Sequence, residues 1–224
     1  MTVMPTEFLN KLNETPLVAI LRGIIPGEIA DAAQVLVEAG FKAIEVPLNS
    51  PEAIRSIDLL VKKYGNSLLI GAGTVLSPEE VAAVAEVGGR LIVSPDMNPG
   101  VIEKTVELGL VSMPGFGTAT EAFSALSAGA SILKLFPAAT YGTAHLSALK
   151  AVLPKNTQLY AVGGVGPSDM ARWFEAGASG VGFGSNLYKP GMTVEEVQHA
   201  AQSIVETFRN TVLNPPSHHL RNVG

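Results

Sequence analysis

Residues 127–137, SAGASILKLFP, contain the pattern from which the fold of the chain can be predicted. A helix is expected to end in the small residues and glycine at 127–129, because glycine readily adopts the left-handed conformation that closes a helix. The apolar run Ile132–Phe136 follows, between Gly129 and Pro137, and is typical of a short buried strand. The segment is therefore predicted to pass from the end of a helix into a strand.

The same order of elements recurs along the chain. Helices are expected to end at Gly40, Gly88, Gly109, Gly129 and Gly177, and an apolar run follows each glycine closely. Successive glycines are 48, 21, 20 and 48 residues apart, so each interval of 48 has room for one further unit. A period of about 20 to 25 residues indicates repeated supersecondary units.

Eight strands alternating with eight helical segments are predicted, and this alternation indicates a parallel sheet closed into a (β/α)8 TIM barrel. The predicted strands span Leu17–Leu21, Ala43–Pro47, Leu68–Thr74, Leu91–Ser94, Leu110–Pro114, Ile132–Phe136, Gln158–Val162 and Gly180–Gly184. The clearest predicted helices span Pro26–Ala39, Pro51–Tyr64, Pro78–Val87, Ala119–Ala128 and Val194–Arg209. Residues 1–224 are predicted to form a single barrel domain, with a leading helix in residues 1–15 and a loosely ordered tail in residues 214–224.

The composition limits the class of protein. The chain of 224 residues is 47% apolar, has a formal net charge of −5 and contains no cysteine. The negative charge disfavours nucleic acids and acidic membranes as partners, and the lack of cysteine excludes disulfides and thiolate metal sites. No apolar run approaches the length of a membrane span, and residues 1–16 lack the apolar core of a signal peptide. We therefore expect a cytoplasmic protein that binds neither nucleic acid nor membrane.

Lys134 is the most unusual residue of the predicted strands. In an extended segment it shares one face with Ile132 and Phe136, while Leu133 and Leu135 occupy the other face. Burial of an ammonium group without partners lowers the pKa of the lysine. A lysine that is neutral near pH 7 can attack a carbonyl carbon to form a Schiff base. The alternative is a structural lysine that pairs with a carboxylate or extends to the surface at the strand end.

Other charged residues also lie in or beside apolar strands. Barrel enzymes carry their chemistry at the carboxyl ends of the strands, where Arg22 and Glu45 are expected together with Lys134. Ile44 and Val46 should face the helices, so Glu45 should point inward. Glu45 is then either an ion-pair partner of the lysine or the general acid and base that Schiff-base chemistry requires.

Glycines mark the ends of several strands. Gly163 and Gly164 after the seventh strand, and Gly184 and Ser185 after the eighth, occupy the usual phosphate site of such barrels. Glycines let backbone N–H groups approach an anion, and helices beginning near Pro167 and Asn186 are expected to add their dipoles. Thr74, in a glycine-rich turn, is a candidate for holding a carboxylate, although a plain tight turn is the alternative.

The histidines show no spacing that suggests a metal site. They are His145, His199, His218 and His219, on predicted helices or in the tail. A metal-dependent reaction is therefore disfavoured.

Taken in order, these motifs resemble the family of 2-keto-3-deoxy-6-phosphogluconate and -galactonate aldolases, which are class I lyases on a (β/α)8 barrel. The resemblance runs from about Pro16 to Arg209 and rests on residues 20–23 (ILRG), 45–51 (EVPLNSP), 71–75 (GAGTV), 133–137 (LKLFP) and 161–165 (AVGGV). Gluconate-type members usually carry an arginine and a threonine where this chain has Asn49 and Val162, so the chain looks like the galactonate branch.

The resemblance implies a homotrimer that needs no cofactor and cleaves 2-dehydro-3-deoxy-6-phosphogalactonate, a phosphorylated keto-deoxy sugar acid, into pyruvate and D-glyceraldehyde 3-phosphate. It also implies that Lys134 forms the Schiff base and that Glu45, through a water molecule, moves the protons. Arg22 and Thr74 would bind the carboxylate end, and Gly163, Gly164, Gly184 and Ser185 the phosphate. The other residues expected to contact the substrate are Pro95, Phe136 and Val162.

Two alternatives stay open. The first is an aldolase for 2-dehydro-3-deoxy-6-phosphogluconate or for 4-hydroxy-2-oxoglutarate, the latter having no phosphate to bind. The second, from a different class, is a catalytically silent barrel that binds sugar phosphates and forms no imine.

Overall fold

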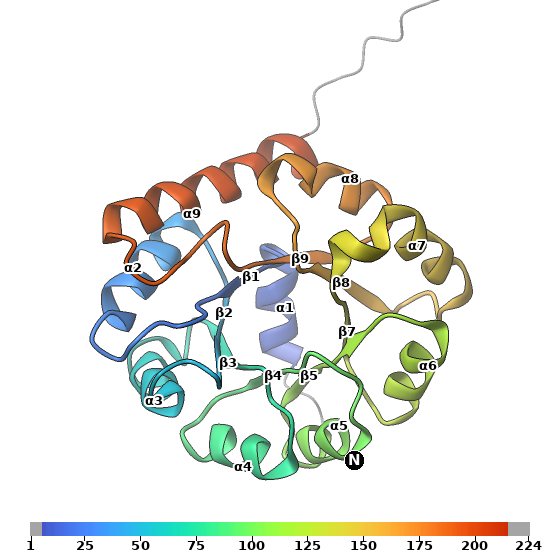
Figure 1. The fold of residues 1–224 in the computed structure, drawn as a ribbon, viewed down its shortest axis with the longest axis horizontal. Helices are drawn as coiled ribbons and strands as arrows, with labels where there is room; N and C mark the ends of the chain where they lie inside the picture. The colour runs from blue at the N-terminus through green and yellow to red at the C-terminus, as the bar shows by residue number, and fades with distance from the viewer. Residues whose placement is uncertain (1–5, 215–224) are drawn as a thin grey trace, which may run out of the picture.

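The computed structural model describes residues 6–214, in which parallel strands form a barrel inside a ring of helices (Figure 1). All strand pairs are parallel, and the strand order is β5-β4-β3-β2-β1-β9-β8-β7-β6. Within the described residues the strands are β1 (Leu17–Ile20), β2 (Ala43–Pro47), β3 (Leu69–Gly73), β4 (Leu91–Val93), β5 (Val111–Met113), β6 (Gly115–Phe116), β7 (Ile132–Leu135), β8 (Gln158–Val162) and β9 (Gly180–Phe183).

The predicted fifth strand, Leu110–Pro114, differs from the observed one. The chain instead forms β5 and β6 on either side of Pro114, which has no N–H for a sheet ladder. β5 pairs with β4, and β6 pairs with β7. The Lys134 N–H donates to the Pro114 carbonyl at 2.9 Å across the break. The (β/α)8 prediction is therefore confirmed, with one of its eight strands interrupted by a proline.

The helices alternate with the strands and cover the outside of the barrel (Figure 1). Those of the ring are α2 (Ile29–Ala39), α3 (Ala53–Tyr64), α4 (Pro78–Glu86), α5 (Pro99–Glu107), α6 (Ala119–Ser127), α7 (Ala138–Val152), α8 (Met170–Glu175) and α9 (Val194–Phe208). A 3₁₀ turn, Pro167–Asp169, precedes α8, and a π-helical segment, Arg209–Leu213, follows α9. In the described part of the chain, no helix is both long and apolar enough to span a membrane.

A further helix, α1 (Thr6–Glu14), closes the amino-terminal end of the barrel (Figure 1). Lys11 Nζ donates to the Asn66 carbonyl at 2.6 Å, just before β3, and Asn13 Oδ1 accepts from Gln158 at the start of β8. Of the predicted leading helix, residues 1–5 lie outside the described residues, as do residues 215–224 of the predicted tail. The prediction of one domain across residues 1–224 stays a prediction.

Alternation along the strands produces two apolar layers. Ile44, Val46, Leu133 and Leu135 belong to the layer between strands and helices, as predicted. The inward faces form a second layer, which Leu12 of α1 joins. Its buried members are Leu12, Val18, Ile20, Ala43, Leu69, Leu91, Val93, Val111, Met113, Ile132, Tyr160 and Val162. The inner layer fills the barrel below the carboxyl ends of the strands and so supports whatever lies at those ends.

Candidate active site

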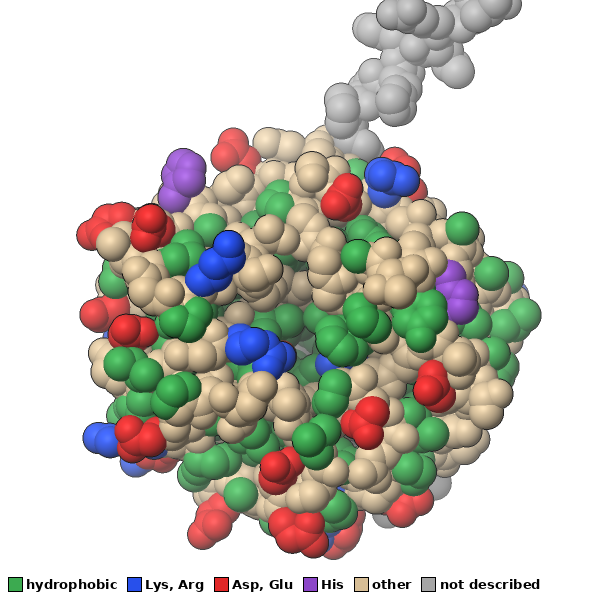
Figure 2. All heavy atoms as spheres, viewed as in Figure 1, with side chains coloured by type: hydrophobic (Ala, Val, Ile, Leu, Met, Phe, Trp, Pro, Cys, Tyr) green, Lys and Arg blue, Asp and Glu red, His purple; other side chains and the backbone are tan. Residues whose placement is uncertain are grey.

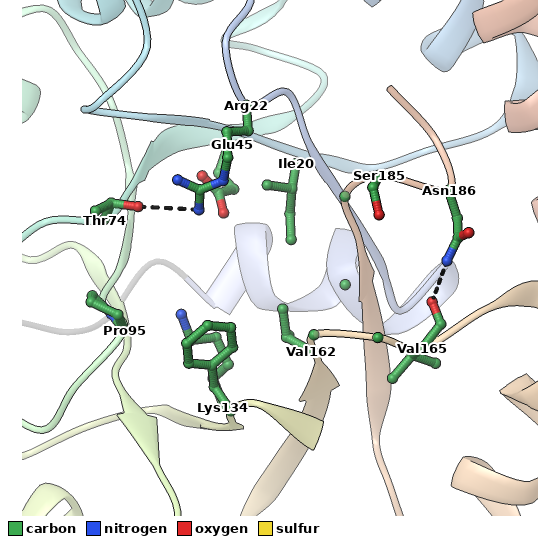
Figure 3. Close-up of a pocket in the computed structure, with 15 residues that line it drawn as sticks. Ile20, Arg22, Glu45, Thr74, Pro95, Lys134, Val162, Val165, Ser185 and Asn186 are labelled. Atoms are coloured by element: carbon green, nitrogen blue, oxygen red, sulfur yellow. Dashed lines mark hydrogen bonds between the residues drawn. The ribbon is translucent and has the colours of Figure 1, made fainter. Parts of the chain in front are cut away.

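A cavity of about 160 Å³ opens at the carboxyl ends of the strands. Figure 2 shows it as a hollow at the centre of this face, with basic side chains beside and within it. Every site residue predicted from the sequence lines this cavity (Figure 3). These residues are Arg22, Glu45, Thr74, Pro95, Lys134, Phe136, Val162, Gly163, Gly164, Gly184 and Ser185.

Lys134 enters the cavity from β7. The residue is 6% exposed, and Nζ lies 4.8 Å from the centroid of the Phe136 ring. Burial lowers the pKa of Lys134 to about 8, against the opposing attraction of the Glu45 carboxylate. The repulsion of Arg22 adds to the lowering. The arrangement therefore provides an amine that is available as a nucleophile close to neutral pH.

Glu45 points into the same cavity from β2, on the opposite side from Lys134 (Figure 3). Burial raises the pKa of Glu45 to about 7, although Lys134 and Arg22 both act to lower it. Its Oε2 atom is buried and has no hydrogen-bond partner in the described structure. The carboxyl group lies against Gly73, where any side chain would collide with it. A carboxyl group with a pKa near 7 can both accept and return a proton at physiological pH.

Arg22 follows β1 at the carboxyl ends of the strands, where the sequence predicted it. The residue lies beyond the end of β1 and is exposed, so its guanidinium group is solvated and is not buried in the apolar layer. Its guanidinium donates to Asn49 Oδ1 at 2.8 Å. It also donates to Thr74 Oγ1 at 3.4 Å (Figure 3). Thr74 adopts a left-handed conformation with φ of 56°. This side of the cavity thus presents a cation and a hydroxyl group held in place by the turns after β1, β2 and β3.

The opposite side of the cavity is built from glycines. Gly163 and Gly164 follow β8 with φ values of 96° and 75°, which favour glycine. A Cβ on Gly164 would lie 2.6 Å from the Ala139 side chain, so the turn also requires glycine for space. Gly184 and Ser185 follow β9 on the same side. Backbone N–H groups in such turns can surround an anion.

One expectation about this side is wrong. No helix begins near Asn186: the chain makes a turn there, and α9 starts only at Val194 after the capping box of Thr193 and Glu196. The Asn186 side chain instead donates to the Val165 carbonyl at 2.9 Å (Figure 3). The predicted helix near Pro167 begins as a 3₁₀ turn.

The sequence reasoning missed four residues that line the cavity: Ile20, Val165, Gly182 and Asn186. Alternation from Gly184 points to Gly182, and a polar side chain directly after Ser185 points to Asn186. Nothing in the sequence marks Val165 as a residue that lines the cavity, because an apolar residue after a glycine turn is common.

Histidines lie elsewhere. His145 Nε2 is 2.7 Å from the Gly117 carbonyl on the outside of the barrel, and its ring stacks on Tyr141. His199 lies on α9, while His218 and His219 fall outside the described residues. Among residues 6–214, no group of three or more His, Asp or Glu side chains is placed to hold a metal ion.

Comparison with known proteins agrees with this geometry. Residues 8–203 match the model of a family described as KDPG and KHG aldolase. The chain is 48% identical over 197 residues to the 2-dehydro-3-deoxy-6-phosphogalactonate aldolase of Escherichia coli K12, covering 88% of this chain and 96% of that relative. It is also 48% identical over 195 residues to the probable 2-dehydro-3-deoxy-6-phosphogalactonate aldolase of Rhizobium meliloti 1021, covering 87% and 92%. A solved structure described as native KDPGal matches with a TM-score of 0.87 at 48% identity, covering 88% of this chain and 95% of that one.

Proposed function

The chain belongs to the KDPG and KHG aldolase family, and we propose that it is a class I lyase that cleaves 2-dehydro-3-deoxy-6-phosphogalactonate into pyruvate and D-glyceraldehyde 3-phosphate. The names of its relatives at 48% identity support this substrate. The observation that carries the chemistry is Lys134, a buried amine with a lowered pKa that faces the buried Glu45 carboxyl group.

In the proposed reaction, the neutral Lys134 amine attacks the C2 carbonyl carbon of the substrate. The carbinolamine then loses water to give a protonated imine, with Glu45 supplying the proton that leaves as part of that water. The imine is an electron sink, so the protein needs no metal for this step. The lowered pKa of Lys134 favours the first step, because only the unprotonated amine is a nucleophile.

Glu45 is next assigned the removal of a proton from the C4 hydroxyl, through a water molecule. As the C3–C4 bond breaks, its electron pair moves into the imine and forms an enamine, while C4 becomes the aldehyde of glyceraldehyde 3-phosphate. Glu45 then returns the proton to C3, and water hydrolyses the resulting imine to release pyruvate and restore the Lys134 amine. A carboxyl group with a pKa near 7 suits both directions of transfer.

The two sides of the cavity suit the two ends of this substrate. Arg22 and Thr74 are proposed to bind the carboxylate next to C2, close to Lys134. The glycine turns after β8 and β9 are proposed to bind the phosphate. Val162, the last residue of β8, would then lie beside the central carbons. The homotrimer implied by the sequence resemblance stays a prediction.

The test is a cleavage assay with three substrates, in which pyruvate release is measured. We expect the highest kcat/KM for the galactonate compound, a lower value for its gluconate epimer, and the lowest for 4-hydroxy-2-oxoglutarate. Inorganic phosphate should compete with the two phosphorylated substrates. A preference for the gluconate epimer would overturn the substrate assignment, and pyruvate binding without a borohydride-reducible adduct would instead favour a silent binding barrel.

A further inference from the structure

The turns that form the glycine side of the cavity, at residues 163–164 and 184–185, carry no cation themselves. Among the residues that line the cavity, the cations are Arg22 and Lys134. Arg22 also lines the second cavity described below, beside the turn that follows β9, but its guanidinium is held by Asn49 and Thr74, and Lys134 is the proposed nucleophile. A phosphate on the glycine side would therefore meet backbone N–H groups and the Ser185 hydroxyl, which leave most of its charge without a counter-charge.

A second cavity of about 410 Å³ adjoins the first on this side. The two share Arg22, Gly184 and Ser185, so they meet at the turn that follows β9. The second cavity is also lined by Lys189, so this residue lies next to the turn proposed to hold the phosphate.

The segment that carries Lys189 is firmly anchored. The N–H groups of Leu187 and Tyr188 both donate to the Gly184 carbonyl, at 2.8 and 2.9 Å. The Leu187 and Tyr188 side chains are buried, and the Tyr188 hydroxyl donates to Glu28 Oε2 at 3.0 Å. The ring of Pro190 packs closely on Gly23. The backbone of Lys189 is thus fixed between the turns that follow β9 and β1.

The Lys189 side chain is available to a ligand. It is exposed, and within the described residues its ammonium makes no hydrogen bond or ion pair. Among the residues that line the second cavity, none is acidic. The Glu28 carboxylate accepts a hydrogen bond from the hydroxyl of Tyr188, the residue before Lys189.

We propose that Lys189 is a specificity-determining residue that binds the phosphoryl group of the substrate from the edge of the cavity. The lysine supplies the charge that the glycine turns lack, and its anchored backbone places the residue beside the cavity that Ser185 also lines. This inference deepens the proposed function and rests on it for the identity of the ligand. An ordinary solvated lysine is the alternative, and it predicts no difference between phosphorylated and unphosphorylated substrates.

The variants for the test are Lys189→Met, Lys189→Arg and the matched control Lys155→Met. Lys155 is exposed just before β8, at the opposite end of the barrel, so its substitution makes the same change in net charge away from the site. Two readouts are needed. One is aldol addition of pyruvate to glyceraldehyde 3-phosphate or to glyceraldehyde, and the other is calorimetric binding of inorganic phosphate without turnover.

Lys189→Met should raise KM for glyceraldehyde 3-phosphate by about tenfold, the size expected for one hydrogen bond to a charged group, with kcat nearly unchanged. KM for glyceraldehyde should change less than twofold, phosphate binding should weaken by a similar factor of about ten, and Lys189→Arg should restore both. Lys155→Met should behave as the unsubstituted protein does. Unchanged phosphate binding in Lys189→Met, or equal losses with both aldehydes, would overturn the inference.

Failure of the proposed function would look different. If the unsubstituted protein did not use glyceraldehyde 3-phosphate, yet bound phosphate about tenfold more tightly than Lys189→Met, the substrate assignment would be wrong. The same result would support Lys189 as the cation of an anion site.

Discussion

The same strands build two regions of the barrel interior that differ completely in chemistry. We call the inner apolar layer the floor, and the cavity lining at the carboxyl ends of the strands the rim. On β7, Ile132 belongs to the apolar floor and Lys134, two residues further, lies in the active cavity. On β2, Ala43 and Glu45 show the same step. A step of two residues along one face of a strand therefore leads from a packed apolar layer to a charged one.

The apolar layer directly below the charged one explains why the pKa of Lys134 is lowered and the pKa of Glu45 is raised. Burial is the largest cause for Lys134 and for Glu45, and it outweighs the attraction between them in each case. The apolar floor keeps water away from the lower side of the two groups, so it weakens the charged form of each. The floor thus contributes to the chemistry of the rim without touching the substrate.

The largest effect is expected from removing the rim amine. Lys134→Met should lower kcat by about 10⁴-fold or more, because the covalent intermediate can no longer form. Borohydride treatment with pyruvate should then give no adduct by intact-mass measurement. Lys104→Met, a matched change on α5, should keep both activity and adduct. An adduct that persists in Lys134→Met would place the imine on another lysine.

A smaller loss is expected from the rim carboxyl group. Glu45→Gln should lower kcat by roughly 10²–10⁴-fold, the usual cost of removing a positioned general acid and base. Pyruvate should still form its adduct with Lys134, although slowly. Glu103→Gln on the exposed side of α5 is the control for charge. Near-normal turnover of a folded Glu45→Gln protein would exclude the proton-transfer role.

The effect of the floor on the pKa of Lys134 can be tested by comparing a variant of the floor with a variant of the outer apolar layer. Leu12→Ala, inside the barrel, and Leu60→Ala, between α3 and the strands, remove the same atoms from fully buried sites. Each should lower the free energy of unfolding by roughly 2–5 kcal/mol in chemical denaturation. Only Leu12→Ala should also move the pKa of Lys134 upward, because water would replace apolar atoms beneath it. Equal pKa changes in both variants would show that the floor has no special role.

The smallest effect concerns Val162, at the boundary between floor and rim. The residue is 7% exposed and lines the cavity at the end of β8. Val162→Thr adds a hydroxyl at nearly constant volume and should shift relative kcat/KM toward the gluconate epimer by about fivefold, for one added hydrogen bond of about 1 kcal/mol. The comparison requires kcat/KM for both epimers in both proteins. An unchanged ratio would mean that Val162 does not read the configuration at C4.

Most of this contrast between floor and rim could be predicted from the sequence. The period of two in buried strands correctly grouped Lys134 with Ile132 and separated it from Leu133, because side chains must alternate in any extended segment. The order of strands along the chain likewise brought residues distant in sequence, such as Arg22 and Ser185, to one end of the barrel.

Other features depended on tertiary contacts. Pro114 reads as the end of a strand, and only the pairing of Gly115 and Phe116 with β7 shows that a second strand follows. The exposure of Arg22 depends on where β1 stops, which apolar patterning does not fix to within one or two residues. The start of α9 was visible in the capping residues Thr193 and Glu196, which are a better guide than the loop at Asn186.

The most direct test of this account is the pH dependence of adduct formation at Lys134. Pyruvate is mixed with the protein at pH values from 6 to about 11, samples are quenched with borohydride, and the modified peptide is quantified by mass spectrometry. The rate at Lys134 should rise with pH and level off above about pH 8, because burial lowers the pKa of the amine to that value and the neutral form then predominates. Glu45→Gln should move this inflection to lower pH, since the carboxylate raises the pKa of the lysine. A rate that keeps rising beyond pH 10, or an adduct at another lysine, would contradict the account.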